Sequence, residues 1–256
     1  CAAPDPSPRA PQVTVPGGAT DCHFHIFDGP SPQIAERSYT APPALLDAFR
    51  HLHTTLRISR SVIVQPSVYG TDNRTTLAAC DTTPQMRAIV VVDEDTPPST
   101  LAAYRKRGAV GCRVNMLFGS NARIDSLCSL AGRIADQGWH LQILGDVSAL
   151  GDRMDEFASL PVPVVFDHFG HLQAIRGIND PGFRRLLRLL GSGAAWVKLS
   201  GAYRLGPAGA QTDRAVADLA AALIAANPKQ LVRGSDRPHP ANPQKDKPNE
   251  GDQHNA

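Results

Sequence analysis

From residue 19 onward, short runs of β-forming residues alternate with longer segments whose apolar residues recur at helical spacing. This alternation is typical of βα units built around a parallel sheet. Eight such runs are present, at 20–24, 59–65, 86–92, 110–115, 140–144, 164–168, 196–200 and 231–234. The pattern predicts an α/β fold, with a closed (β/α)8 TIM barrel as the simplest solution and an open doubly wound sheet as the alternative.

Seven segments between these runs have the spacing of helices, at 43–56, 74–80, 99–107, 124–137, 147–159, 181–190 and 213–226. Pro43, Pro98 and Pro181 lie where three of them begin, a position that tolerates the missing N–H of proline. Glycine follows several of the predicted helix ends, as at Gly108 and Gly138. Several strands are almost continuously apolar, including SVIVQ and AIVVV, as expected of parallel strands covered on both faces.

The two ends of the chain do not share this pattern. Residues 1–18 are rich in proline and alanine and are expected to form a flexible leader, whereas residues 241–256 form a polar tail that is expected to be disordered. The barrel is therefore predicted at 19–240. No eighth helical segment follows the last strand, so we expect a barrel that lacks its eighth helix and exposes apolar surface there.

Composition argues against several classes of partner. A net charge of +2, from 26 basic and 24 acidic side chains, gives no overall field that would attract nucleic acid. No apolar run reaches the roughly 18 residues that span a bilayer, so no transmembrane segment is expected. The five cysteines include no C-x-x-C pair, so neither a disulfide framework nor a structural zinc site is indicated.

Polar residues with catalytic potential follow three of the predicted strands. His23 and His25 end the first strand, and their alternation points both imidazoles to the same side. His168 ends the sixth strand, and Asp236 follows the eighth. Active sites of such barrels lie at the carboxyl ends of the strands, and four polar groups gathered there are hard to explain by packing. The sequence therefore predicts a functional cluster at the barrel mouth.

Three motifs around these residues resemble the amidohydrolase 2 family. They are TDCHFHIFD, which contains His23 and His25, FDHFG, which contains His168, and GSDRPHP, which contains Asp236. Within that family the chain looks most like the lactonase branch that includes the hydrolases of 2-pyrone-4,6-dicarboxylate. The resemblance covers about 19–240, and the three motifs together are far more specific than any one alone.

The resemblance implies hydrolysis of a cyclic ester. Asp236 would take a proton from water, and His23, His25 and His168 would polarise the lactone carbonyl and stabilise the developing oxyanion. These roles are chemically sound, because water needs a positioned base and each preorganised donor to an oxyanion contributes about 3 kcal/mol.

In many relatives in the wider superfamily, the same residues bind a divalent metal. The predicted end of strand four carries Arg113 and no carboxylate or lysine to bridge two ions, and an arginine disfavours a second cation. We therefore expect that no cofactor is required. The alternative is one zinc ion held by His23, His25, His168 and Asp236.

The expected substrate is a small anionic lactone. Six residues at or after the ends of the predicted strands are substrate-binding candidates: Tyr39, Ser67, Arg113, Arg123, His171 and Arg204. Arg113 and Arg204 match positions at which the family binds carboxylates. His171 stands where the family typically has an arginine and Arg237 departs from a second family motif, so Arg123 is a possible replacement for a lost carboxylate contact.

Two other functions are compatible with the sequence. One is a metal-dependent decarboxylase of the same family, and the other is a catalytically silent, truncated barrel. Either a monomer or a homo-oligomer is expected. The resemblance implies a cytoplasmic enzyme, whereas Cys1 would indicate a periplasmic or lipid-anchored protein if it is a processed N-terminus.

Overall fold

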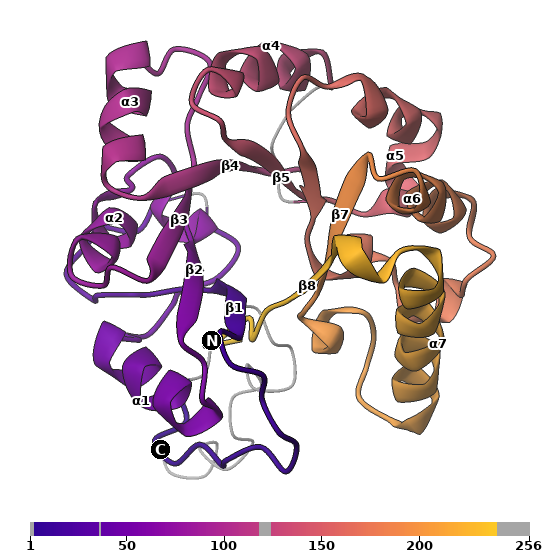
Figure 1. The fold of residues 1–256 in the computed structure, drawn as a ribbon, viewed down its shortest axis with the longest axis horizontal. Helices are drawn as coiled ribbons and strands as arrows, with labels where there is room; N and C mark the ends of the chain where they lie inside the picture. The colour runs from indigo at the N-terminus through magenta and orange to yellow at the C-terminus, as the bar shows by residue number, and fades with distance from the viewer. Residues whose placement is uncertain (1–2, 36, 118–123, 240–256) are drawn as a thin grey trace, which may run out of the picture.

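The computed structural model describes residues 3–35, 37–117 and 124–239. Eight strands form one sheet in the order β1 to β8, and each pairs in parallel with the next along the chain (Figure 1). The strands are β1 (Thr20–Phe24), β2 (Arg60–Val64), β3 (Met86–Val90), β4 (Ala109–Asn115), β5 (His140–Leu144), β6 (Val164–Phe166), β7 (Ala195–Leu199) and β8 (Leu231–Arg233). The strand order confirms the predicted barrel and is incompatible with a doubly wound sheet, in which the order reverses.

The ring is closed by the segment that follows β8. Arg237 forms a parallel bridge with Phe24 of β1, and the backbone N–H of His25 donates to the carbonyl of Arg237 at 2.8 Å. The N–H of Asp236 donates to the carbonyl of His23 at 2.7 Å. Closure therefore places the aspartate after β8 directly beside the two histidines that end β1.

Helices surround the strands, as Figure 1 shows. The α-helices are α1 (Leu46–Leu56), α2 (Arg74–Asp81), α3 (Pro98–Lys106), α4 (Ile124–Ala135), α5 (Val147–Leu150), α6 (Pro181–Gly191) and α7 (Ala210–Ala226). Short 3₁₀ helices are η1 (Ser67–Tyr69), η2 (Gly151–Ser159), η3 (His168–His171), η4 (Ala174–Arg176), η5 (Ala202–Arg204) and η6 (Pro228–Gln230). Three of the 3₁₀ helices, η1, η3 and η5, follow a strand closely and carry predicted site residues.

Two of the helix predictions were wrong in detail. The helix expected over 147–159 is divided into α5 and η2, because Gly151 has φ 56° and ψ −135°, a conformation that interrupts the α-helical path. The helix expected from Pro43 begins later, because Ala44 is held in an antiparallel bridge with Phe27. Pro98 and Pro181 do lie in the first turns of α3 and α6.

The hydrophobic core lies largely between the strands and the helices. In α6 the buried Phe183, Leu186 and Leu190 face this core, whereas Arg184 and Arg188 lie on the other side of the helix. Burial of one face of each helix against the sheet stabilises the ring, at about 25 cal/mol per Å² of apolar surface.

The ends of the described chain contain little regular structure. Residues 3–18 form neither helix nor strand. No helix follows β8 up to His239, and the expected tail lies in residues 240–256, outside the described part, so the missing eighth helix stays a prediction. None of the described helices is both long and apolar enough to cross a bilayer.

Candidate active site

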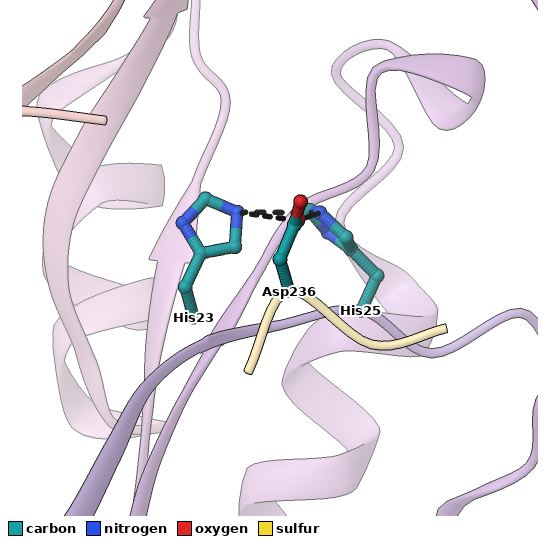
Figure 2. Close-up of side chains that lie close together, drawn as sticks. All are labelled: His23, His25 and Asp236. Carbon is teal, nitrogen blue, oxygen red and sulfur yellow. Dashed lines mark hydrogen bonds and ion pairs between the residues drawn. The ribbon is translucent and has the colours of Figure 1, made fainter. Parts of the chain in front are cut away.

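The two histidines at the end of β1 point into the mouth of the barrel. Their Nε2 atoms are 3.3 Å apart, and their rings meet edge to face (Figure 2). His23 is 0% exposed and His25 is 2% exposed, so both imidazoles are shielded from bulk solvent. The alternation of side chains along β1 thus brings both rings to one point, as the sequence predicted.

Asp236 and His168 complete this cluster. Oδ1 of Asp236 lies 3.7 Å from Nε2 of His23, 3.6 Å from Nε2 of His25 and 3.9 Å from Nε2 of His168. Asp236 and His168 are also fully buried. The structure therefore brings together all four residues that the sequence assigned to catalysis.

Unusual backbone conformations aim these side chains. His168 has φ 50° and Asp236 has φ 54°, which is the left-handed region that costs a non-glycine residue about 1–3 kcal/mol. Gly201 lies between them with φ 60°, and a Cβ there would come within 2.7 Å of Nδ1 of His168 and 3.0 Å of Oδ2 of Asp236. A glycine at this position lets the loop after β7 approach both groups.

The two carboxylate oxygens of Asp236 have different surroundings. Oδ2 accepts hydrogen bonds from Oη of Tyr203 and from Nε of Arg204, both at 2.7 Å. Oδ1 is buried without a hydrogen-bond partner among the described residues. Burial alone would raise the pKa of Asp236, but Arg204 and the neighbouring imidazoles outweigh it and hold that pKa well below its usual range. Asp236 is therefore an anion at neutral pH, with one oxygen anchored.

The imidazoles are neutral in this surrounding. Burial lowers the pKa of His23 to about 3, and it also lowers the pKa values of His25 and His168. Nδ1 of His25 lies 2.9 Å from the carbonyl oxygen of Val64, which can only accept, so Nδ1 carries the proton. Nδ1 of His168 contacts Oγ of Ser200 at 2.9 Å, while its Nε2 has no hydrogen-bond partner among the described residues.

A buried polar network lies behind His23. Asp167 accepts hydrogen bonds at Oδ2 from Nε of Arg113 and from Nε2 of Gln142, both at 3.0 Å. Lys198 donates to Oε1 of Gln142 at 2.7 Å. Sequence reasoning did not assign Asp167, Gln142 or Lys198 to the site. The available signal was polar residues at inward positions of otherwise apolar strands.

The predicted substrate-binding residues lie in different settings. Ser67 and Arg113 line the same cavity, and the ring of Tyr39 lies 6.4 Å from that of Phe27. Arg204 is engaged with Asp236, and the ring of His171 lies 6.3 Å from that of His168.

Arg123 is the one predicted binding residue whose position is not described, because it falls in the segment 118–123.

A cavity of about 180 Å³ is lined in part by Arg113, whose Nε contacts Asp167 behind His23, whereas the four clustered residues are not part of its wall. Its polar lining includes Ser67, Arg113, Asn115 and Arg37. Arg37 was not predicted from the sequence, because it lies in an irregular segment without periodicity. Tyr203 was also missed, although it directly precedes the predicted Arg204.

The donor set can hold a divalent cation. Ligand atoms of His23, His25 and Asp236 lie within 4.8 Å of one another, as do those of His23, Asp167 and His168. Nitrogen and carboxylate oxygen suit zinc, and Oδ1 of Asp236 and Nε2 of His168, neither of which has a hydrogen-bond partner among the described residues, are 3.9 Å apart. The residues therefore fit one metal ion as well as a water molecule or a substrate oxygen.

Known proteins share both the sequence and the fold. The chain is 31% identical over 248 residues to 2-pyrone-4,6-dicarboxylate hydrolase of Comamonas testosteroni, covering 91% of this chain and 81% of that protein. It is 30% identical over 238 residues to 4-sulfomuconolactone hydrolase of Hydrogenophaga intermedia, covering 89% and 77%. A structure from Acinetobacter baumannii, described as a probable 2-pyrone-4,6-dicarboxylic acid hydrolase with citric acid bound, has a TM-score of 0.80 at 26% identity, over 88% of this chain and 85% of that one.

A family model confirms the relationship that the three sequence motifs indicated. The amidohydrolase model matches residues 20–254, which include the whole described barrel from β1 onward. Together with the shared fold and the long alignments, this match shows that the chain belongs to the amidohydrolase family.

Proposed function

We propose that this chain hydrolyses a small carboxylated lactone similar to 2-pyrone-4,6-dicarboxylate, with Asp236 as the general base. The observation that carries the proposal is the asymmetry of Asp236. Its Oδ2 is held by Tyr203 and Arg204, and its Oδ1 faces three imidazoles without a hydrogen-bond partner among the described residues.

This geometry supports attack of water on a lactone carbonyl. Oδ1 of Asp236 accepts a proton from water as the water oxygen bonds to the carbonyl carbon. The carbonyl oxygen gains negative charge, and an N–H group at Nε2 of His23 or His168 stabilises it, each contributing about 3 kcal/mol, whereas Nε2 of His25 has no proton to donate. The ring C–O bond then breaks, and the leaving oxygen takes up the proton that Asp236 accepted from water. Because the four groups are buried, these interactions act in a medium of low polarity.

The cavity lined by Arg113 supports an anionic substrate. Arg37 and Arg113 both line it, and a guanidinium can bind a carboxylate through two parallel hydrogen bonds. The related enzymes from Comamonas testosteroni and Hydrogenophaga intermedia are named for lactones that carry carboxylate or sulfonate groups, and the Acinetobacter baumannii protein holds citric acid. The named substrates of these two enzymes and the citric acid are all small molecules with several acidic groups.

We expect the reaction to need no cofactor, with one zinc ion as the alternative. His23, His25, His168 and Asp236 would hold that ion, and a bound zinc would supply Lewis-acid chemistry at the lactone carbonyl. In both cases the chain's own residues orient the lactone through its carboxylates.

The test is a panel of carboxylated lactones and their uncharged analogues, assayed with the purified protein after exhaustive chelation and metal analysis. We expect turnover of a carboxylated lactone to persist. Asp236→Asn should lower kcat by about a hundredfold or more, because the base is lost, while calorimetry still detects substrate binding. Asp218→Asn, an exposed change on α7, is the matched control.

Three results would change the proposal. Unchanged turnover in Asp236→Asn would remove that residue from catalysis. Activity that disappears on chelation and returns with zinc would favour the zinc-dependent alternative. A folded protein that turns over no lactone in the panel would contradict the proposed reaction itself.

A further inference from the structure

Nδ1 of His23 lies between a cation and an anion. Nζ of Lys198 is 3.4 Å from this nitrogen, and Oδ1 of Asp167 is 3.3 Å from it. Lys198 and Asp167 are themselves 3.5 Å apart. A neutral imidazole carries one ring hydrogen, so Nδ1 can accept from the ammonium or donate to the carboxylate, but not both.

The choice at Nδ1 decides what His23 presents at Nε2. The neighbouring His25 has its proton on Nδ1, bonded to the carbonyl of Val64, so its Nε2 can only accept. If His23 is protonated at Nε2, it donates across the 3.3 Å contact to His25. If His23 is protonated at Nδ1, its Nε2 carries a lone pair, as does Nε2 of His25. These two lone pairs and Oδ1 of Asp236 then face one another, an arrangement that is favourable around a cation.

Both controlling groups are fixed in place by other contacts. Lys198 donates to the carbonyl of Cys22 at 2.9 Å and to Oε1 of Gln142 at 2.7 Å, which leaves its third N–H for His23. Oδ2 of Asp167 accepts from Arg113 and Gln142, whereas Oδ1 has no hydrogen-bond partner among the described residues. Gln142 holds both groups, because its amide oxygen faces Lys198 and its amide nitrogen faces Asp167.

We infer that Lys198 and Asp167 are positioning residues that select the tautomer of His23. Lys198 stabilises the form with a proton on Nε2, in which His23 donates a hydrogen bond into the site. Asp167 stabilises the form with a proton on Nδ1, in which His23 offers a lone pair to a divalent cation. Neither Lys198 nor Asp167 changes its charge in this scheme. Only the catalytic consequence rests on the proposed function.

Nitrogen NMR of the metal-free protein labelled with ¹⁵N in histidine tests this directly, because protonated and unprotonated ring nitrogens have distinct chemical shifts. A His23→Gln variant assigns the signals. We expect His23 to be protonated at Nε2 in the unaltered protein. If His23 of the unaltered protein is instead protonated at Nδ1, that result alone overturns the inference.

Two substitutions should move zinc affinity in opposite directions. Lys198→Met removes the donor to Nδ1, so His23 shifts toward the Nδ1–H form and zinc should bind about tenfold more tightly. In Asp167→Asn the amide oxygen replaces Oδ2 toward Arg113 and Gln142, which turns the amide NH₂ toward Nδ1 of His23. This variant should hold the Nε2–H form and bind zinc about tenfold more weakly.

General damage to the site would weaken zinc binding in both variants, and that outcome would contradict tautomer selection. Lys198→Arg keeps a donor and should retain the His23 signals of the unaltered protein. Lys229→Met on the exposed η6 is the matched control and should change neither signals nor affinity.

The proposed function is tested separately by turnover. Metal-free Lys198→Met should hydrolyse the lactone about tenfold more slowly through kcat. If the NMR signals and zinc affinities follow the expected pattern while no lactone is turned over, the tautomer inference stands and the proposed reaction fails.

Discussion

Three arginines near the proposed site have different partners. Nε of Arg113 donates to Asp167, and Nε of Arg204 donates to Asp236, so both help to place groups around the histidines. Arg37 instead donates to Oγ1 of Thr40 and to the carbonyl of Ile34, which are uncharged. Because Arg37 has no charged partner among the described residues, we expect its positive charge on the cavity wall to recognise the substrate rather than to hold the catalytic cluster.

Replacement of Arg37 should affect substrate binding far more than chemistry. Arg37→Gln is expected to raise KM for a carboxylated lactone about tenfold, since a charge-assisted hydrogen bond contributes about 1.5 kcal/mol, with little change in kcat. Steady-state kinetics with charged and uncharged lactones check this, and Arg188→Gln on the exposed face of α6 is the control. An equal rise in KM for the uncharged lactone would exclude recognition of charge by Arg37.

Among the elements, α5 and α6 support the turn that carries His168. A Cβ at Gly170 would come within 2.6 Å of Cγ1 of Val147 and 2.8 Å of Cδ2 of Leu186, so the turn packs tightly on both helices. The start of α6 is fixed by Asp180, whose Oδ1 accepts from the backbone N–H groups of Gly182 and Phe183. Capping of α6 therefore contributes to the rigidity of the site.

Asp180→Ala should destabilise the protein by about 1–2 kcal/mol at pH 7, the usual effect of losing such a cap. Burial opposes ionisation of Asp180, but Arg176 and the two backbone N–H groups outweigh it and lower its pKa. A lowered folded-state pKa stabilises the protein above the unfolded value of about 3.9, and this contribution is lost as pH falls through the folded value.

The stability difference between the unaltered protein and Asp180→Ala should therefore be constant above about pH 5 and should shrink toward acid pH. Urea unfolding across this range measures it. Asp218→Ala, in the exposed middle of α7, should show no such trend, and a difference that grows with acidity would contradict the assigned role of Asp180.

At the scale of the whole molecule, the site depends on closure of the barrel. His23 and His25 are near the start of the described chain and Asp236 is near its end, yet the bridge between Phe24 and Arg237 brings them into contact. Every strand from β1 to β8 belongs to one sheet. Loss of any part of the ring should therefore separate the aspartate from the histidines.

We expect the barrel to unfold as one cooperative unit. Trp139 precedes β5 and Trp196 lies in β7, and they are the only two tryptophans of the sequence, so fluorescence reports on the second half of the ring. Fluorescence, far-ultraviolet circular dichroism and loss of activity should then have coincident urea midpoints. Separate transitions would instead indicate that the two halves of the ring unfold independently.

The sequence by itself determined the succession of strands and helices and the residues that end the strands. These depend on local patterns, namely the periodicity of apolar residues and the alternation of side chains along a strand. His23, His25, His168 and Asp236 could be placed at one barrel mouth because parallel strands end at the same edge. The family could be identified because its motifs are short and contiguous.

Only the tertiary structure decided how these groups are paired. Tyr203 and Arg204 hold one oxygen of Asp236, Lys198 and Asp167 meet at His23, and Arg37 reaches the cavity. Each of these contacts joins segments that are distant in the chain, and their distances follow from strand register, barrel closure and loop conformation. The local periodicity of the sequence does not determine such distances. The electrostatics of the site could therefore be described only from the folded chain.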